Sequence, residues 1–271
     1  MALDPFKGKR KGGIPESVIA HSEDHDEEAK KAKKNFETYY DFLTTDYSVA
    51  KEMMDLIGPQ PTSSENPIGK LDLEILRPAG IQIFMEMLND LAFNPPAGKN
   101  TLYMGSMNGS EGFILSRLMQ QSYDNGYNGF LIDTKGRPLQ NAGSYLKGNR
   151  QNPARAEIHA LDVFLSANNC RHANIDVHAN AKASGRENYG ATITIFGSSD
   201  NTLGLSSKYS SFQADELKIS DKSITQDLGR KSKHCSFDIL SKAGFVVLEN
   251  PWFNTYSFKG SLEGLIQLNA I

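Results

Sequence analysis

The chain has 271 residues, of which 39% are hydrophobic and 23% charged, a composition that supports a sizeable core and excludes a wholly disordered protein. Its formal net charge of −3 argues against a protein whose main task is to hold a nucleic-acid backbone. Two cysteines, Cys170 and Cys235, exclude a disulfide framework and a cysteine-rich zinc site. Because no apolar run approaches the roughly 20 residues of a membrane span and no apolar stretch marks a secretory signal, we expect a cytoplasmic protein without membrane contact.

The N-terminal part divides into two predicted segments. Residues 1–25 lack periodicity and predict a flexible arm, whose basic cluster is either solvated or in contact with nucleic acid. Residues 26–66 predict a helical segment that ends in the break at 58–67, which is rich in proline and serine. The remainder, 67–271, is predicted to form one α/β domain. The basic cluster consists of Lys7, Lys9, Arg10 and Lys11, and the apolar face of the helical segment of Phe36, Tyr39, Tyr40 and Leu43.

The most informative stretch predicts a strand, a glycine loop, a helix, a second strand and an acid. Thr101–Met104 reads as the first strand, Gly105–Gly109 as the loop, Ser110–Ser122 as the helix and Gly129–Ile132 as the second strand. The acid is Asp133. This order is the opening half of a nucleotide-binding α/β unit.

The other predicted elements favour a mostly parallel sheet flanked by helices, which is a Rossmann-like α/β fold. No internal repeat is apparent. The predicted helices are 81–93, 154–166 and 237–243, and the predicted strands are 173–178, 191–196 and 245–248.

The glycine loop has a physical rationale as a ligand site. Gly105 and Gly109 carry no Cβ, so the backbone could turn sharply and approach a ligand, and the following helix would direct its free N–H groups into the loop. Gly112 would let that helix pack closely on the sheet. Asp133, at a strand end, could accept hydrogen bonds from a ribose diol. The alternative is that the glycines form an ordinary strand–helix turn and Asp133 caps the next element.

The stretch Leu102–Gly112, followed by Phe130–Asp133, resembles the first two motifs of class I S-adenosylmethionine-dependent methyltransferases, and Ile239–Leu248 resembles their late helix-to-strand passage. The resemblance implies S-adenosylmethionine as cofactor and methyl transfer to an unidentified substrate, either a small molecule or a macromolecule. No catalytic residue need be visible, because the sulfonium is already activated. Carried over by position, the cofactor-binding residues are Gly105, Ser106, Asn108, Gly109 and Asp133, with Asp176 on the adenine side.

Two other functions stay open at the level of sequence. A nicotinamide-dependent oxidoreductase would use the same loop and acid. A non-catalytic interaction protein with a degenerate pocket would account for Tyr103 and Met107, where the resembling family usually has an acid and a glycine.

We expect no metal site. Asp176 and His178 share a face of their predicted strand, but surface polar residues are the simpler interpretation. Glu157 and His159 fall two apart on the predicted helix 154–166 and would face differently.

Overall fold

The computed structural model describes residues 22–45, 67–94, 100–218, 226–243, 246–249, 253–259, 261–262 and 266–269. The helices are α1 (Ser22–Thr45), the 3₁₀ turn η2 (Pro67–Lys70), α3 (Pro78–Phe93) and α4 (Asn100–Asp124). The strands are β1 (Phe130–Asp133), β2 (Leu139–Gln140), β3 (Ala154–Phe164), β4 (Ala173–Ser184), β5 (Thr192–Leu203), β6 (Ser211–Lys218), β7 (Gln226–Leu228), β8 (Ser236–Ala243), β9 (Val246–Glu249), β10 (Thr255–Phe258), β11 (Ser261–Leu262) and β12 (Ile266–Asn269).

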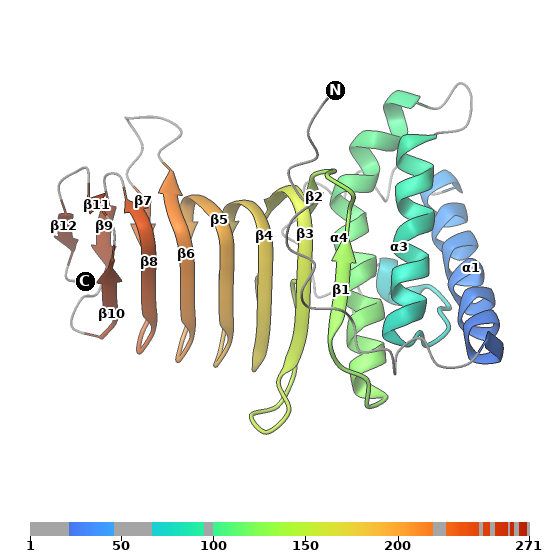
Figure 1. The fold of residues 1–271 in the computed structure, drawn as a ribbon, viewed down its shortest axis with the longest axis horizontal. Helices are drawn as coiled ribbons and strands as arrows, with labels where there is room; N and C mark the ends of the chain where they lie inside the picture. The colour runs from blue at the N-terminus through green and yellow to red at the C-terminus, as the bar shows by residue number, and fades with distance from the viewer. Residues whose placement is uncertain are drawn as a thin grey trace.

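In the part of the chain that the structure describes, the twelve strands form one sheet, and every pairing is parallel. Its central path runs β1-β3-β4-β5-β6-β8-β10, and Figure 1 shows these strands side by side along the long axis. Short turns, without a helix, connect β3 to β4, β4 to β5 and β5 to β6. The long strands also shift register partway along, for example between His159 and Asp162. The chain therefore coils as a solenoid, each coil stacking on the one before it.

The coils repeat in backbone conformation more than in residue identity. From Arg155 to its partner Asn174, and from Thr192 to its partner Ser211, one coil takes about 19 residues. The turns repeat a set of three residues with positive φ, in which glycine is frequent because L side chains rarely adopt that conformation. The expectation of no internal repeat is therefore wrong. The sets are Ala167, Asn169 and His172; Gly185, Glu187 and Gly190; Gly204, Ser206 and Tyr209; and Gly229, Lys231 and His234.

Stacked side chains fill the interior of the solenoid. Phe212, Phe237 and Tyr256 occupy one register row, with ring centroids 5.1 Å and 5.2 Å apart and nearly parallel planes. Gly204 has φ +74°, and a Cβ there would lie 2.5 Å from Cε1 of Phe237. Its coil must therefore turn without a side chain to make room for the ring.

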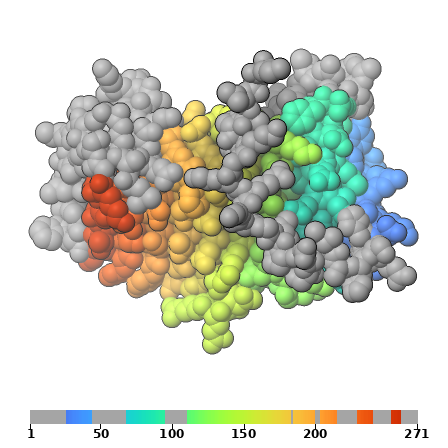
Figure 2. All heavy atoms as spheres, viewed as in Figure 1, coloured from blue at the N-terminus to red at the C-terminus, as the bar shows by residue number. Residues whose placement is uncertain are grey.

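The helices lie at the N-terminal end of the sheet, and in Figure 2 the coils follow them in chain order along the long axis. Helix α1 packs on α3, α3 contacts α4 and β1, and α4 contacts β2. A Cβ at Gly112 would lie 1.8 Å from the carbonyl oxygen of Gln140, so this glycine lets α4 touch the backbone beside β2. The prediction that Gly112 allows close helix–sheet packing is confirmed.

A buried polar network ties this helical end to the first strand. The Arg137 side chain donates through Nη1 and Nη2 to the Glu111 carboxylate at 3.1 Å and 2.7 Å, and through Nε and Nη2 to Asn89 Oδ1 at 3.0 Å and 2.7 Å. Asn89 Nδ2 donates in turn to the carbonyl of Asp133 at 2.9 Å. Burial raises the pKa of the Glu111 carboxyl, while the neighbouring guanidinium acts in the opposite direction. The ion pair is therefore buried, and removing one partner should lower the free energy of unfolding more than it would at the surface.

The predicted α/β class, the mostly parallel sheet and the N-terminal helical segment are confirmed, as are the helix at 81–93 and the strand ending at Asp133. Three local predictions are wrong. The expected strand and loop at 101–109 belong to helix α4, and the expected helices at 154–166 and 237–243 are strands β3 and β8. In β3 the buried residues Ala154, Ala156 and Ile158 alternate with exposed neighbours, which is the period of a strand.

The N-terminal predictions can be followed only in part. Helix α1 begins at Ser22, within the predicted arm 1–25, and its buried Tyr39 and Leu43 form the expected apolar face. Residues 1–21 lie outside the described part of the chain, and so does the predicted break at 58–67 except for Pro67, where η2 begins. None of the described helices combines the length and the apolar character that crossing a membrane requires.

Both cysteine thiols are expected to be unreactive in the folded protein. Cys170 is fully buried, which raises the pKa of its thiol to about 12, and burial also raises the pKa of Cys235. Since the thiolate is the reactive form, titration with Ellman's reagent at pH 8 should detect no thiol in the native chain and two in guanidinium chloride. Rapid reaction of one thiol in the native protein would contradict the buried placement.

Candidate functional site

Residues Gly105, Ser106, Asn108 and Gly109 lie within α4, so the structural premise of a glycine loop after a strand is wrong. Asp133 Oδ1 accepts a hydrogen bond from the backbone N–H of Lys135 at 2.8 Å. A bond from this carboxylate to the N–H two residues further on closes the turn after β1 as an Asx turn. The binding of S-adenosylmethionine at these positions stays a prediction.

Asp176 is separated from Asp133 in the sheet. It lies exposed on β4, beside Glu157 of β3 and Thr194 of β5, whereas Asp133 ends β1. Strand β3 runs between β1 and β4, so these two predicted cofactor residues lie on strands that are not neighbours.

A recurring quartet of residues precedes and opens several strands. Its first residue is a cation, its second an aromatic or imidazole ring, its third a small buried residue and its fourth a hydroxyl or amide residue. Parallel bridges align Lys147, Arg171, Tyr189, Lys208 and Lys233. The quartets that begin at Lys208 and Lys233 therefore lie side by side, and the coil of Tyr189 lies between those that begin at Arg171 and Lys208. The complete quartets are Arg171-His172-Ala173-Asn174, Lys208-Tyr209-Ser210-Ser211 and Lys233-His234-Cys235-Ser236.

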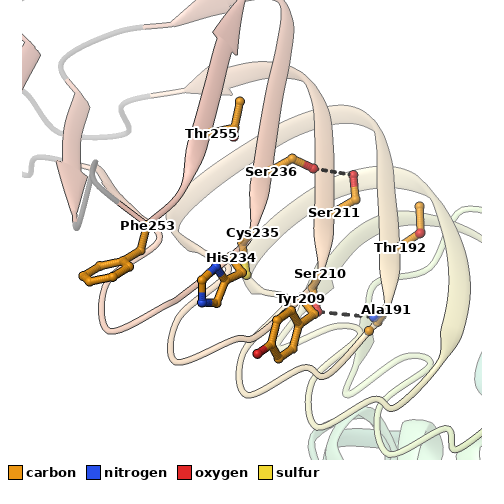
Figure 3. Close-up of a pocket in the computed structure, with 11 residues that line it drawn as sticks. Ala191, Thr192, Tyr209, Ser210, Ser211, His234, Cys235, Ser236, Phe253 and Thr255 are labelled. Carbon is orange, nitrogen blue, oxygen red and sulfur yellow. Dashed lines mark hydrogen bonds between the residues drawn. The ribbon is translucent and has the colours of Figure 1, made fainter.

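The rings and the hydroxyl or amide residues of the quartets line two adjoining surface grooves with volumes of about 400 and 360 Å³, whereas the cations of the quartets are not among the lining residues. Both grooves include Gly190 and Tyr209, so together they extend across several coils. We call the pair the ladder groove. In Figure 3 the rings of Tyr209, His234 and Phe253 project from successive turns, while Ser211 and Ser236 stand on successive strands. The groove lining comprises Asn149, Arg150, Pro153, His172, Asn174, Tyr189, Gly190, Ala191, Thr192, Tyr209, Ser210, Ser211, His234, Cys235, Ser236, Phe253 and Thr255.

Rings form one side of the ladder groove. The centroid of Tyr189 lies 5.6 Å from that of His172 and 5.6 Å from that of Tyr209, both edge to face. Tyr209 and His234 stack at 5.2 Å with 5° between their planes, and Phe253 follows His234 at 6.1 Å. Tyr209 is 58% exposed and Phe253 47%. Solvent-exposed rings in such a row offer an extended apolar edge to a ligand.

Hydroxyl groups form the other side. Thr192, Ser211, Ser236 and Thr255 are register partners on β5, β6, β8 and β10, one on each coil. Ser236 Oγ donates to Ser211 Oγ at 2.9 Å, so these two hydroxyls lie within hydrogen-bonding distance of each other. Each hydroxyl can both donate and accept.

Cations border the row of rings. Lys147, Arg171, Lys208 and Lys233 are all exposed. The guanidinium of Arg171 lies 5.7 Å from the ring centroid of Tyr189, and the ammonium of Lys233 lies 5.4 Å from that of Phe253. Tyr189 occupies the aligned position between Arg171 and Lys208, so the four cations form two pairs. Within each pair the coils are adjacent, about 4.7–4.9 Å apart, and their positive charges favour an anionic partner.

The sequence analysis did not find the ladder groove. Its signal was present: a ring follows a cation in Arg171-His172, Lys208-Tyr209 and Lys233-His234, and a hydroxyl or amide residue follows two positions after the ring. The insertion between β6 and β8 makes the spacing irregular, which hides the period from inspection. The quartets become equivalent only once the strand register is known.

Comparisons of the chain with protein-family models, with curated proteins and with solved structures find no match. What the structure establishes is an α/β fold with a mostly parallel sheet.

Proposed function

We propose that the protein binds a linear anionic polysaccharide along the ladder groove, with uronic-acid polymers as the substrate class. The observation that carries the proposal is the side-by-side course of a row of rings and a row of hydroxyls along the groove, bordered by cations at four of the five positions that the parallel bridges align. A site that repeats along an axis fits a ligand that repeats along its length. A small molecule would contact only one or two coils.

Each row matches one part of a sugar acid. The hydroxyls of Thr192, Ser211 and Ser236 can exchange hydrogen bonds with sugar hydroxyls. The exposed edge formed by the rings can pack against the apolar faces of pyranose units. The lysines and Arg171 can pair with carboxylates, and the guanidinium does so through two parallel hydrogen bonds.

A single-stranded nucleic acid is also a linear anion, but the ring geometry favours it less. Sequence-tolerant binding of nucleic acid relies on bases that stack on accessible aromatic faces. Tyr209 and His234 stack on each other with parallel planes 5.2 Å apart, so these two rings cover part of each other's faces. Hydroxyl groups beside the exposed edges of rings suit the binding of a sugar better than the stacking of a nucleobase.

Methyl transfer with S-adenosylmethionine, and the nicotinamide-dependent alternative, stay predictions of the sequence. Cofactor pockets are usually concave and bury most of the ligand, whereas the ladder groove lies on the surface. Titration with S-adenosylmethionine, S-adenosylhomocysteine and NAD tests those activities independently of the polysaccharide proposal.

The test is calorimetric titration of the full chain with oligogalacturonate, and with the same oligomer after methyl esterification as the uncharged control. We expect binding of the charged oligomer only. The double variant Lys208→Ala/Lys233→Ala should weaken it at least tenfold, which corresponds to about 1.4 kcal/mol, and Tyr209→Ala/His234→Ala should do the same.

The charge-matched control is Lys30→Ala/Lys33→Ala on α1, both exposed and remote in sequence from the groove. It should leave the affinity unchanged. An equal loss of affinity in the α1 variant would show that the oligomer responds only to the net charge of the protein and does not bind at the groove. Tighter binding of poly(U) than of oligogalacturonate would overturn the proposal in favour of nucleic acid.

A further inference from the structure

A second cluster of functional side chains lies on the outer face of the sheet, where His178 is four residues further along β4 than Asn174 of the ladder groove. It consists of Glu157, His159 and His178. Glu157 and His159 are two apart on β3 and therefore point to the same face, and His178 is the register partner of His159 on β4. The expectation that Glu157 and His159 face differently is wrong, because the segment is a strand and not a helix.

The donor atoms of the three side chains converge. Nε2 of His159 lies 2.7 Å from Oε1 of Glu157, and Nε2 of His178 lies 3.4 Å from the same oxygen. One ligand atom from each residue lies within 4.8 Å of the others. All three residues are partly exposed, so an ion can reach them from solvent.

Ring stacking orients the two imidazoles. The centroids of His159 and His178 are 4.3 Å apart with 9° between their planes, and Phe196 of β5 continues the stack beyond His178 at 4.4 Å and 8°. Three rings from three adjacent strands thus support one another. Both Nε2 atoms are held on the side of Glu157, which reduces the entropy that ligation would otherwise cost.

Neighbouring carboxylates add negative charge around the cluster. Asp176 is the register partner of Glu157, and Asp133 is the register partner of His159. Like charges directly opposite on neighbouring strands destabilise a sheet. A divalent cation bound between Glu157 and the histidines would offset that repulsion.

From this geometry we infer that Glu157, His159 and His178 form a binding site for a divalent transition metal, with Zn²⁺ as the best-suited ion. Two imidazole nitrogens and one carboxylate oxygen are a ligand set that Zn²⁺ accepts, and three protein ligands leave a position for water or for a group of a bound molecule. The sequence analysis expected no metal, since the strand pairing that unites His178 with the other two is invisible in it. This inference is independent of the polysaccharide proposal.

The test is calorimetric titration of the untagged, chelator-treated full chain with ZnCl₂, followed by Co²⁺ titration monitored by visible absorption. We expect one Zn²⁺ ion to bind tightly per chain. The Co²⁺ spectrum should show the ligand-field bands of a site that contains imidazole. Because even residues that only support metal ligands contribute 10–100-fold to affinity, His159→Ala/His178→Ala should weaken Zn²⁺ binding by about 100-fold or more. Glu157→Gln should also weaken it.

The matched control is His172→Ala/His234→Ala, which removes two histidines of the ladder groove. This variant should still bind one Zn²⁺ ion tightly per chain. Circular dichroism and thermal unfolding of each variant without metal will show that the sheet is intact. Tight binding that survives in His159→Ala/His178→Ala would place the ion elsewhere and overturn the inference. Failure of the unaltered chain to bind Zn²⁺ below millimolar concentrations would do so as well, leaving the three side chains as a hydrogen-bonded surface cluster.

Discussion

Replacing Arg137 with methionine is expected to lower the free energy of unfolding by about 3–5 kcal/mol, because it leaves a carboxylate buried without its partner. Glu111 is completely buried and Arg137 nearly so, with 0% and 7% of their side-chain surfaces exposed. The same substitution also removes two donors to Asn89, which bridges α3 and the end of β1. Equilibrium unfolding in guanidinium chloride measures the effect.

Two further variants separate the ion pair from other effects of the substitution. Arg155→Met, at an exposed position on β3, should change the free energy of unfolding by less than about 0.5 kcal/mol. In Glu111→Leu/Arg137→Met neither charge remains, so the double variant should be more stable than Arg137→Met alone. If the double variant were the less stable of the two, an unpaired Glu111 could not be the cause of the loss.

Replacing Phe237 with alanine should cost about 3–5 kcal/mol as well, because it opens a cavity in the middle of the inner stack. Phe237 is 1% exposed and lies between Phe212 and Tyr256. Its ring also occupies the space next to Gly204, where a Cβ would meet it at 2.5 Å. The expected loss therefore combines removed ring contacts with a void that the rigid turn cannot fill. Thermal and chemical unfolding would both report it.

A matched aromatic residue provides the comparison. Phe164, at the end of β3, is 37% exposed and lies under the ammonium of Lys182 at 5.2 Å. Phe164→Ala should cost under about 1 kcal/mol, since little cavity forms at a half-exposed site. Comparable losses in Phe164→Ala and Phe237→Ala would mean that the inner stack is not the core of the solenoid.

The helix at 81–93 and the strand at 129–132 were predictable because each has a clear local pattern and a clear end. Segment 154–164 was not, because Ala154, Ala156, Ile158, Leu161 and Val163 fit part of a helical stripe as well as an alternating strand. The choice between the two periods depends on what lies on each side. The segment is a strand because the stacked coils bury one face of β3 and leave the other exposed to solvent, which matches the alternating pattern.

In the glycine-rich stretch at 105–112 part of a helix was mistaken for a loop, whereas in segment 154–164 a strand was mistaken for a helix. Glycines after four apolar or β-forming residues fit a strand–loop–helix, yet the whole segment belongs to α4. Gly112 allows α4 to lie against the backbone of Gln140 and Asn141, which is the packing role that the sequence predicted for it. For Gly105 and Gly109 the sequence favoured a loop, because glycine also suits a sharp turn of the backbone next to a ligand.

The sequence by itself determined that the chain combines helices with strands and that a helical segment lies near its N-terminus, because these follow from local patterns of apolar and polar residues. It also predicted a mostly parallel sheet, although two of the helices on which that prediction rested, at 154–166 and 237–243, are strands. The tertiary structure alone decided that strands follow strands as stacked coils. It also decided that Lys208, Tyr209 and Ser211 lie beside Lys233, His234 and Ser236, and that His178 joins Glu157 and His159. These relations depend on strand register between coils. Register is fixed by which side chains fill the shared core, and that choice is made by residues far apart in the chain.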